Sequence, residues 1–115
     1  MEPPTLHDIY DARPRVYEHL RPTPLLSHPL LVADIGTPVF VKHENHNPTG
    51  AFKIRGGLNL VATLGASERS AGVATASTGN HGQSLAMACG LRQVPCTIYV
   101  PIANNPEKNA AMRGY

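Results

Sequence analysis

The fold is decided by residues 73–100, whose sequence is VATASTGNHGQSLAMACGLRQVPCTIYV. Its two ends, 73–76 and 96–100, are short runs rich in β-branched residues, which are typical of strands. Between them, apolar spacing predicts a helix from about 80 to 89, closed by Gly90. A strand, a helix and a second strand in this order indicate an α/β layer in which the strands run parallel.

The same alternation extends to both sides of this stretch. A strand is predicted at 39–42, and apolar spacing predicts a helix from 53 to 64 that Gly65 ends. After the last strand, Asn105 and Pro106 are typical of an N-cap and a first helical residue. We therefore expect the α/β class, with parallel-sheet layers and flanking helices.

The amino-terminal region is less regular. Residues 5–20 are predicted to be helical, because Thr5 and Asp8 have the spacing of a capping box, and Pro14 divides or kinks this helix. The prolines within residues 21–24 require an extended chain. An apolar patch that we expect to be buried follows, made of Leu25, Leu26, Leu30 and Leu31.

Composition limits the classes of protein that fit. At 115 residues and 42% hydrophobic content, the chain can bury one small core. The net charge of +2 comes from scattered basic residues, so nucleic acid is not an expected partner. The amino terminus has no apolar run, and no stretch is long and apolar enough for a membrane span, which together predict a cytoplasmic protein.

No metal site or disulfide is expected. Cys89 and Cys96 lack CxxC spacing and have no further thiol to complete a zinc site. Residues 43–46, HENH, have the form HxxH rather than the HExxH of a zinc protease.

Two polar segments carry the candidate chemistry: residues 48–57, PTGAFKIRGG, and residues 77–83, STGNHGQ. Each is predicted to open a helix at the carboxyl end of a strand, where parallel sheets bind ligands. The first presents Lys53 directly after a glycine-containing turn and an aromatic residue. The second presents hydroxyl, amide and imidazole groups separated by glycines. A lysine available for imine chemistry and a polar, glycine-spaced cradle favour an aldehyde cofactor and an anionic substrate.

Each of these residues also has a structural interpretation. A lone lysine is usually a surface residue, and Phe52 can equally be a core aromatic. Polar residues at a helix start are common N-caps without any ligand. Arg55 is expected to pair with a carboxylate or with carbonyl groups. Glu44 can orient the turn before Lys53, although a lone acid is more often solvated or paired. Successive glycines at 56 and 57 indicate close backbone packing.

The two segments, together with KHEN at 42–45, resemble the threonine/serine dehydratase (ammonia-lyase) branch of the pyridoxal-phosphate enzymes. This branch also includes serine racemase, and it belongs to fold type II, the tryptophan synthase beta-like superfamily. The resemblance implies pyridoxal phosphate as cofactor, bound through an imine to Lys53, with Phe52 beside its ring. It further implies that Asn80 hydrogen-bonds the phenolic oxygen of the cofactor. The substrate carboxylate is then held by Ser77, Thr78, Gly79 and His81, with a supporting role for His81 preferred over direct proton transfer.

In this family the lysine released from the cofactor acts as the base at the substrate Cα. The resemblance therefore implies conversion of L-threonine or L-serine to a 2-oxo acid and ammonia. Serine racemisation, β-replacement, dehydration of another hydroxy amino acid, or a non-catalytic remnant remain alternatives.

Family members are much longer than this chain, so we expect an amino-terminal piece that is inactive alone. Residues 1–72 would start the larger domain and residues 73–115 the smaller one. The glycine-rich phosphate cup and the partner of the pyridine nitrogen are expected beyond Tyr115. By the same resemblance, the full-length enzyme is expected to be a homodimer that acts on a small amino acid.

Overall fold

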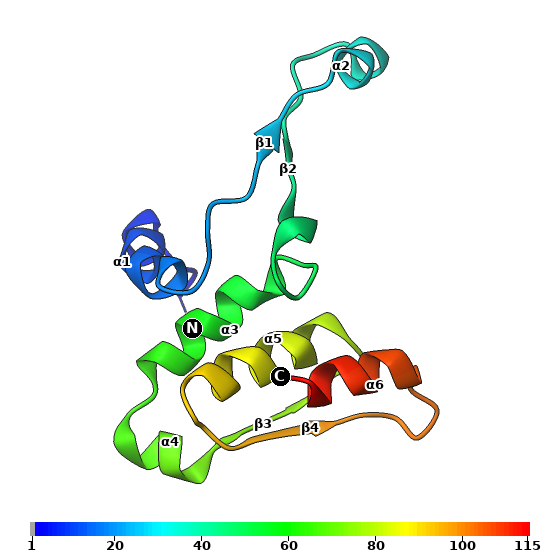
Figure 1. Ribbon diagram of the computed structural model, residues 1–115. Helices are drawn as coiled ribbons and strands as arrows, with labels where there is room; N and C mark the ends of the chain where they lie inside the picture. The colour runs from blue at the N-terminus through cyan, green and yellow to red at the C-terminus, as the bar shows by residue number, and fades with distance from the viewer. Residues whose placement is uncertain (1) are drawn as a thin grey trace.

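The centre of the fold is a parallel pair of strands joined by a helix. The computed structural model describes residues 2–115. Strand β3 (Val73–Ala76) pairs in parallel with β4 (Cys96–Tyr99), and helix α5 (Asn80–Leu91) connects them. Helix α6 (Pro106–Arg113) follows β4 and packs beside α5 (Figure 1). This arrangement confirms the predicted α/β class and its parallel sheet, with the second strand one residue shorter than expected.

Helix α5 ends in a Schellman motif rather than at Gly90. The helix continues to Leu91, and Gln93 takes the left-handed conformation with a φ of 53°. The Gln93 N–H donates to the Gly90 carbonyl at 3.3 Å, and the Val94 N–H donates to the Cys89 carbonyl at 2.9 Å. The prediction that Gly90 closes the helix is therefore wrong, because a glutamine supplies the turn that glycine usually supplies.

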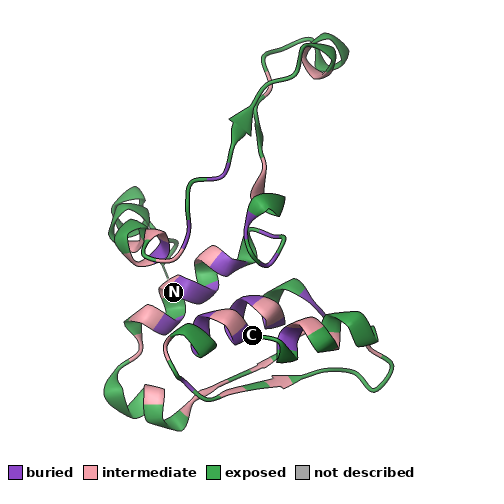
Figure 2. Cartoon of the chain, viewed as in Figure 1, coloured by how far each residue is buried: buried purple, intermediate pink, exposed green. Residues whose placement is uncertain are grey.

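The hydrophobic core lies where three helices meet. Helix α1 (Leu6–Tyr17) packs on α3 (Lys53–Thr63), and α3 packs on α5. Buried segments face each other across α3 and α5 (Figure 2). The core side chains are Val16, Leu20, Ile54, Leu58, Val61, Leu85, Ala88, Cys89 and Val94. A single core therefore joins residues that lie before and after the sheet's first strand.

Helix α3 matches the predicted helix at 53–64 to within one residue, but Gly65 does not end it. Leu64 is already extended, with a ψ of 132°, and Gly65 is the N-cap of a short helix α4 (Ala66–Ala71). The Gly65 N–H donates to Glu68 Oε2 at 2.7 Å. The expectation for Gly65 is wrong, because the acid three residues later makes this glycine a helix start.

Helix α1 begins with the predicted capping box. The Thr5 N–H donates to Asp8 Oδ2 at 2.7 Å, and the Asp8 N–H donates to Thr5 Oγ1 at 3.3 Å. Pro14 lies inside the helix and does not divide it, since the Glu18 N–H still donates to the Pro14 carbonyl at 3.0 Å. Pro14 stands near the carboxyl end of α1, so it removes a single helical hydrogen bond and the helix continues for one more turn.

Residues 25–42 form an arm that extends away from the rest of the molecule (Figure 1). Strand β1 (Leu25–Leu26) pairs antiparallel with β2 (Val41–Lys42), and helix α2 (Pro29–Ile35) lies at the tip. The strand predicted at 39–42 is therefore shorter than expected and does not join the parallel sheet. The sequence predicts β2 from its composition, but it does not predict that β2 pairs with β1.

The apolar patch on this arm is not buried as predicted. Leu25, Leu26 and Leu30 are 57%, 56% and 75% exposed, and only Leu31 is partly covered. An apolar run becomes buried only where a second layer covers it, and within residues 2–115 no such layer lies against the arm.

Candidate active site

The first predicted site segment folds into a tight turn, residues 47–53, which we call the Lys53 turn. Gly50 has a positive φ of 64°, and its N–H donates to the Asn47 carbonyl at 2.8 Å. The buried Asn47 side chain donates to the Ala51 carbonyl at 3.3 Å. Lys53 therefore begins α3 directly after a turn whose backbone is held by its own hydrogen bonds.

The Lys53 side chain is exposed and lies beside the neighbouring aromatic ring. Its Nζ stands 5.2 Å from the centroid of Phe52, and it forms no ion pair within residues 2–115. Phe52 is itself 59% exposed, so the alternative of a core aromatic is wrong here. The amine is thus unpaired and next to an open apolar surface, as an amine that reacts with a carbonyl group must be.

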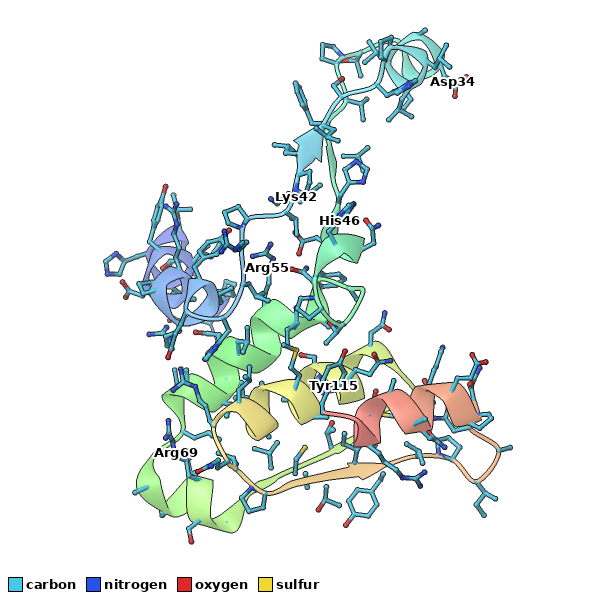
Figure 3. All side chains as sticks on the ribbon, in the orientation of Figure 1. Asp34, Lys42, His46, Arg55, Arg69 and Tyr115 are labelled. Carbon is cyan, nitrogen blue, oxygen red and sulfur yellow. The ribbon has the colours of Figure 1, made fainter. Side chains whose placement is uncertain are left out.

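An ion pair braces the Lys53 turn from outside. Arg55 Nε donates to Glu44 Oε2 at 2.6 Å, and Arg55 Nη2 donates to Glu44 Oε1 at 2.9 Å. Glu44 opens a short 3₁₀ helix, η1 (Glu44–His46), and Arg55 lies at the base of the arm (Figure 3). The geometry confirms that Arg55 pairs with a carboxylate and that Glu44 orients the turn.

The Glu44 carboxylate is held by more than the arginine. Thr23 Oγ1 donates to Oε1, and Asn47 Nδ2 donates to Oε2 at 2.9 Å. The Arg55 guanidinium is the main cause that lowers the pKa of Glu44 from about 4.5 to about 2, with help from the Thr23 and Asn47 hydrogen bonds. Glu44 is therefore ionised at neutral pH, and it ties η1 and α3 to Thr23, in the extended segment that precedes the arm.

In the second predicted segment, residues 77–83, residues 77–79 form a loop between β3 and α5 that we call the Ser77 loop, and the rest starts α5. Ser77 Oγ accepts hydrogen bonds from the Gly79 N–H at 3.2 Å and the Gly82 N–H at 2.9 Å. It therefore caps the start of α5, as the structural interpretation of this cluster expected. Thr78 and Asn80 are exposed, and their polar groups remain open to a ligand.

The structure places the predicted site residues in two groups. Phe52, Lys53 and His81 line one shallow pocket of about 360 Å³, on the side of α5 that faces α3. Ser77 and Thr78 line a separate hollow of about 560 Å³ at the carboxyl ends of β3 and β4. Gly79 and Asn80 form the stretch of chain between the two groups.

Two residues that sequence reasoning did not select also belong to this region. The Lys108 side chain of α6 lies over the Ser77 loop, with its Nζ 3.6 Å from the position that a Cβ on Gly79 would occupy. Ser84 of α5 is fully buried, and its hydroxyl donates to the Lys53 carbonyl at 2.7 Å. The only sequence signal for Ser84 is its spacing: it lies four residues after Asn80, and therefore on the same face of the predicted helix.

Within residues 2–115, no three His, Cys, Asp or Glu side chains come close enough together to hold a metal ion. The described helices also include none that is long and apolar enough to cross a membrane. The chemistry of the candidate site therefore has to be argued from the lysine amine, the aromatic ring and the loop.

These groups fit an aldehyde cofactor and an anionic substrate. The unpaired amine of Lys53 can bind an aldehyde, and the exposed face of Phe52 can cover a flat ring. The start of α5 presents N–H groups and the exposed Thr78 side chain beside the cation of Lys108, which suits a carboxylate.

Comparison with known proteins agrees with this chemistry. The "Pyridoxal-phosphate dependent enzyme" family matches residues 16–115. L-threo-3-hydroxyaspartate ammonia-lyase of Saccharomyces cerevisiae is 40% identical over 97% of this chain and 34% of its own length. L-threonine ammonia-lyase of Geobacter sulfurreducens is 39% identical over 93% of this chain and 27% of its own length.

The solved structure of serine racemase from Dictyostelium discoideum superposes with a TM-score of 0.92 at 39% identity, covering 96% of this chain and 36% of that one. The chain thus spans about a third of the length of the relatives it matches. The family match covers most of the chain, and the fold and the predicted cofactor agree with it. The chain belongs to the pyridoxal-phosphate-dependent enzymes of fold type II, in the group of hydroxy-amino-acid lyases and racemases.

Proposed function

We propose that this chain is the lysine-bearing part of an ammonia-lyase that converts L-serine or L-threonine to a 2-oxo acid and ammonia. The observation that carries the proposal is the pocket shared by Lys53, Phe52 and His81, at the helix start that also holds the hydroxyl-bearing loop. A base and an aromatic surface on one side of this helix start, with a carboxylate cradle on the other, are groups that removal of the Cα proton of an amino acid requires.

The proposed roles are those that the family resemblance implies for these residues. Pyridoxal phosphate, when bound, supplies an aldehyde and an electron-poor ring that stabilises negative charge at the substrate Cα. Lys53 would hold the cofactor through its amine, and the same Nζ, when free, would accept the Cα proton. Phe52 covers the ring and excludes water, and the Asn80 amide donates to the phenolic oxygen.

The substrate carboxylate is assigned to the Ser77 loop. Ser77 and Thr78 offer hydroxyl groups, and His81 supports the loop from the pocket side. The Gly79 N–H donates to Ser77 Oγ in this structure and would turn to the carboxylate when the substrate binds. Lys108 adds a positive charge beside this loop. The β-hydroxyl would leave as water with the proton taken from Cα, and hydrolysis of the resulting enamine by a second water would give the 2-oxo acid and ammonia.

Related substrates and reactions define the competing outcomes. One relative acts on L-threo-3-hydroxyaspartate and another is a serine racemase, so racemisation of serine is the second candidate. The division into a larger domain starting with residues 1–72 and a smaller one starting with residues 73–115 remains a prediction. The phosphate cup outside these residues, the homodimer and the cytoplasmic location also remain predictions.

A substrate panel on the full-length protein tests the proposal. L-serine, L-threonine and L-threo-3-hydroxyaspartate are each assayed for 2-oxo acid, ammonia and the D-enantiomer. We expect 2-oxo acid from L-serine or L-threonine, a visible imine band that Lys53→Ala removes, and a borohydride-reduced adduct on Lys53 in the peptide mass spectrum. We also expect the isolated 115-residue chain to give no product.

Other outcomes would replace the proposal. If only hydroxyaspartate gives product, the substrate is a dicarboxylic amino acid rather than L-serine or L-threonine. If D-serine forms without 2-oxo acid, the protein is a racemase. An adduct on a lysine other than Lys53 would remove the assignment of the site.

A further inference from the structure

Ser84 occupies the closest approach between α3 and α5. Its side chain is 0% exposed, and its Oγ donates to the Lys53 carbonyl at 2.7 Å. A buried hydroxyl without a partner is costly, so this hydrogen bond is a strong constraint on how the two helices cross. The carbonyl belongs to the same residue whose amine carries the proposed chemistry.

Gly57 makes this approach possible. A Cβ added to Gly57 would stand 2.3 Å from Ser84 Oγ and 2.8 Å from the Ser84 carbonyl oxygen, which no side chain tolerates. At Gly56, by contrast, a Cβ would meet nothing within 4 Å. The prediction of close backbone packing is therefore confirmed at Gly57 and wrong at Gly56. The register of the crossing is fixed at Gly57 and Ser84.

The position of Ser84 on α5 connects it to the Ser77 loop. Asn80 is the first residue of α5, and Ser84 lies four residues later, on the same face of the helix. Ser77 Oγ caps this same helix through the Gly82 N–H at 2.9 Å. One rigid turn of helix therefore separates the loop from the hydrogen bond that holds the Lys53 backbone.

We propose that Ser84 is a positioning residue, which holds the backbone of Lys53 at a fixed distance from the Ser77 loop. The amine then reaches the Cα of a substrate whose carboxylate the loop has bound. The proposal rests on the proposed function, since it assumes that Lys53 is the base and the loop is the carboxylate site. Ser84 itself touches neither substrate nor cofactor.

The test compares Ser84→Ala with Cys89→Ala in the full-length protein. Cys89 lies on the same helix, is also 0% exposed and contacts the core without a bond to Lys53. Both variants lose buried contacts, but only Ser84→Ala releases the Lys53 carbonyl. We expect Ser84→Ala to lower kcat about 10-fold with KM within about twofold, because displacing a base by a fraction of an ångström costs rate rather than affinity.

A second readout does not depend on turnover. The rate at which pyridoxal phosphate added to the apo-protein forms the Lys53 imine, followed by absorbance, is expected to fall with Ser84→Ala and to be unchanged with Cys89→Ala. Ser84→Cys keeps a weaker donor at the same place and is expected to give intermediate values of kcat and of this rate. It also serves as the measured variant if Ser84→Ala does not fold.

Two results would overturn the positioning role: a kcat and imine rate for Ser84→Ala within about twofold of the unchanged protein, or equal losses in Cys89→Ala. Failure of the Lys53 assignment looks different, because Lys53→Ala would then retain the imine band and the activity, and failure of the proposed reaction would appear in the products of the substrate panel.

Discussion

The Lys53 turn and the Ser77 loop both start a helix, but only the Lys53 turn has support from distant residues. Besides its own Gly50 and Asn47 hydrogen bonds, the Lys53 turn is braced from outside by the Glu44–Arg55 pair and by Ser84. The Ser77 loop is held by its own hydroxyl, through the Gly79 and Gly82 N–H groups.

The difference matches what each segment has to present. A reactive amine must be kept at one point, which long-range contacts achieve because they come from rigid neighbours. The proposed carboxylate site must leave polar groups open to the ligand, and the Thr78 side chain of this short glycine-containing loop and the Asn80 side chain that follows it are exposed. Breaking each kind of support should therefore have different effects on stability and on binding.

The largest effect is expected from Gly57→Ala. The added Cβ would collide with the Ser84 backbone and separate α3 from α5, which we expect to lower the free energy of unfolding by about 3 kcal/mol. The matched control is Gly56→Ala, where the space is open and the better helix former is expected to raise stability by about 0.5–1 kcal/mol. Urea unfolding of both variants decides this, and equal effects would show that the crossing is not tight.

A smaller effect is expected from Glu44→Gln, which leaves the partly buried Arg55 without its anion. We expect a loss of about 2 kcal/mol in the free energy of unfolding, because Glu44 and Arg55 side chains are only 18% and 24% exposed. Glu18→Gln is the control, since the Glu18–Arg92 pair has one partner 53% exposed and should contribute less than about 1 kcal/mol. Equal losses would show that the brace is an ordinary surface pair.

The same pair predicts how stability depends on pH. The pKa of Glu44 is lowered on folding from about 4.5 to about 2, so its contribution is complete above pH 4.5 and is lost as the pH falls toward 2. We expect the unchanged protein to lose about 1–3 kcal/mol over this window through Glu44. Unfolding measured from pH 5 to pH 2 should show a shallower slope for Glu44→Gln, and parallel slopes would contradict the assignment.

The smallest effect on stability is expected in the Ser77 loop. Ser77→Ala removes the acceptor for the Gly82 N–H and is expected to cost about 1 kcal/mol. Thr78→Ala removes an exposed hydroxyl and is expected to change stability by less than about 0.5 kcal/mol.

Substrate binding sharpens this last comparison. Both loop variants are expected to raise KM for the amino acid several-fold, because each removes a proposed carboxylate donor. Steady-state kinetics on the full-length protein measures this. If KM rises only with Ser77→Ala, Thr78 does not bind the substrate carboxylate.

Much of the local structure could be predicted from the sequence. The capping box at Thr5, the N-cap at Asn105, the helix start at Lys53 and the strands β3 and β4 each depend on a few neighbouring residues. The predictions failed where a neighbour was misjudged: Gly65 starts a helix, and Gln93 rather than Gly90 provides the left-handed turn. Helix α2 was not predicted, although Pro29 is typical of a helix start and Gly36, with a φ of 78°, is typical of a helix end.

The sequence by itself determined the α/β class and placed Lys53 and the Ser77 loop, the two proposed site segments, at helix starts. Those features depend on periodicity, capping and glycine positions within a few residues of one another. Only the tertiary structure decided that Glu44 pairs with Arg55, that Ser84 meets Gly57 and the Lys53 carbonyl, and that the leucines of the arm are exposed. Those contacts join residues far apart in the chain, and their geometry is fixed by how whole helices pack rather than by any local pattern.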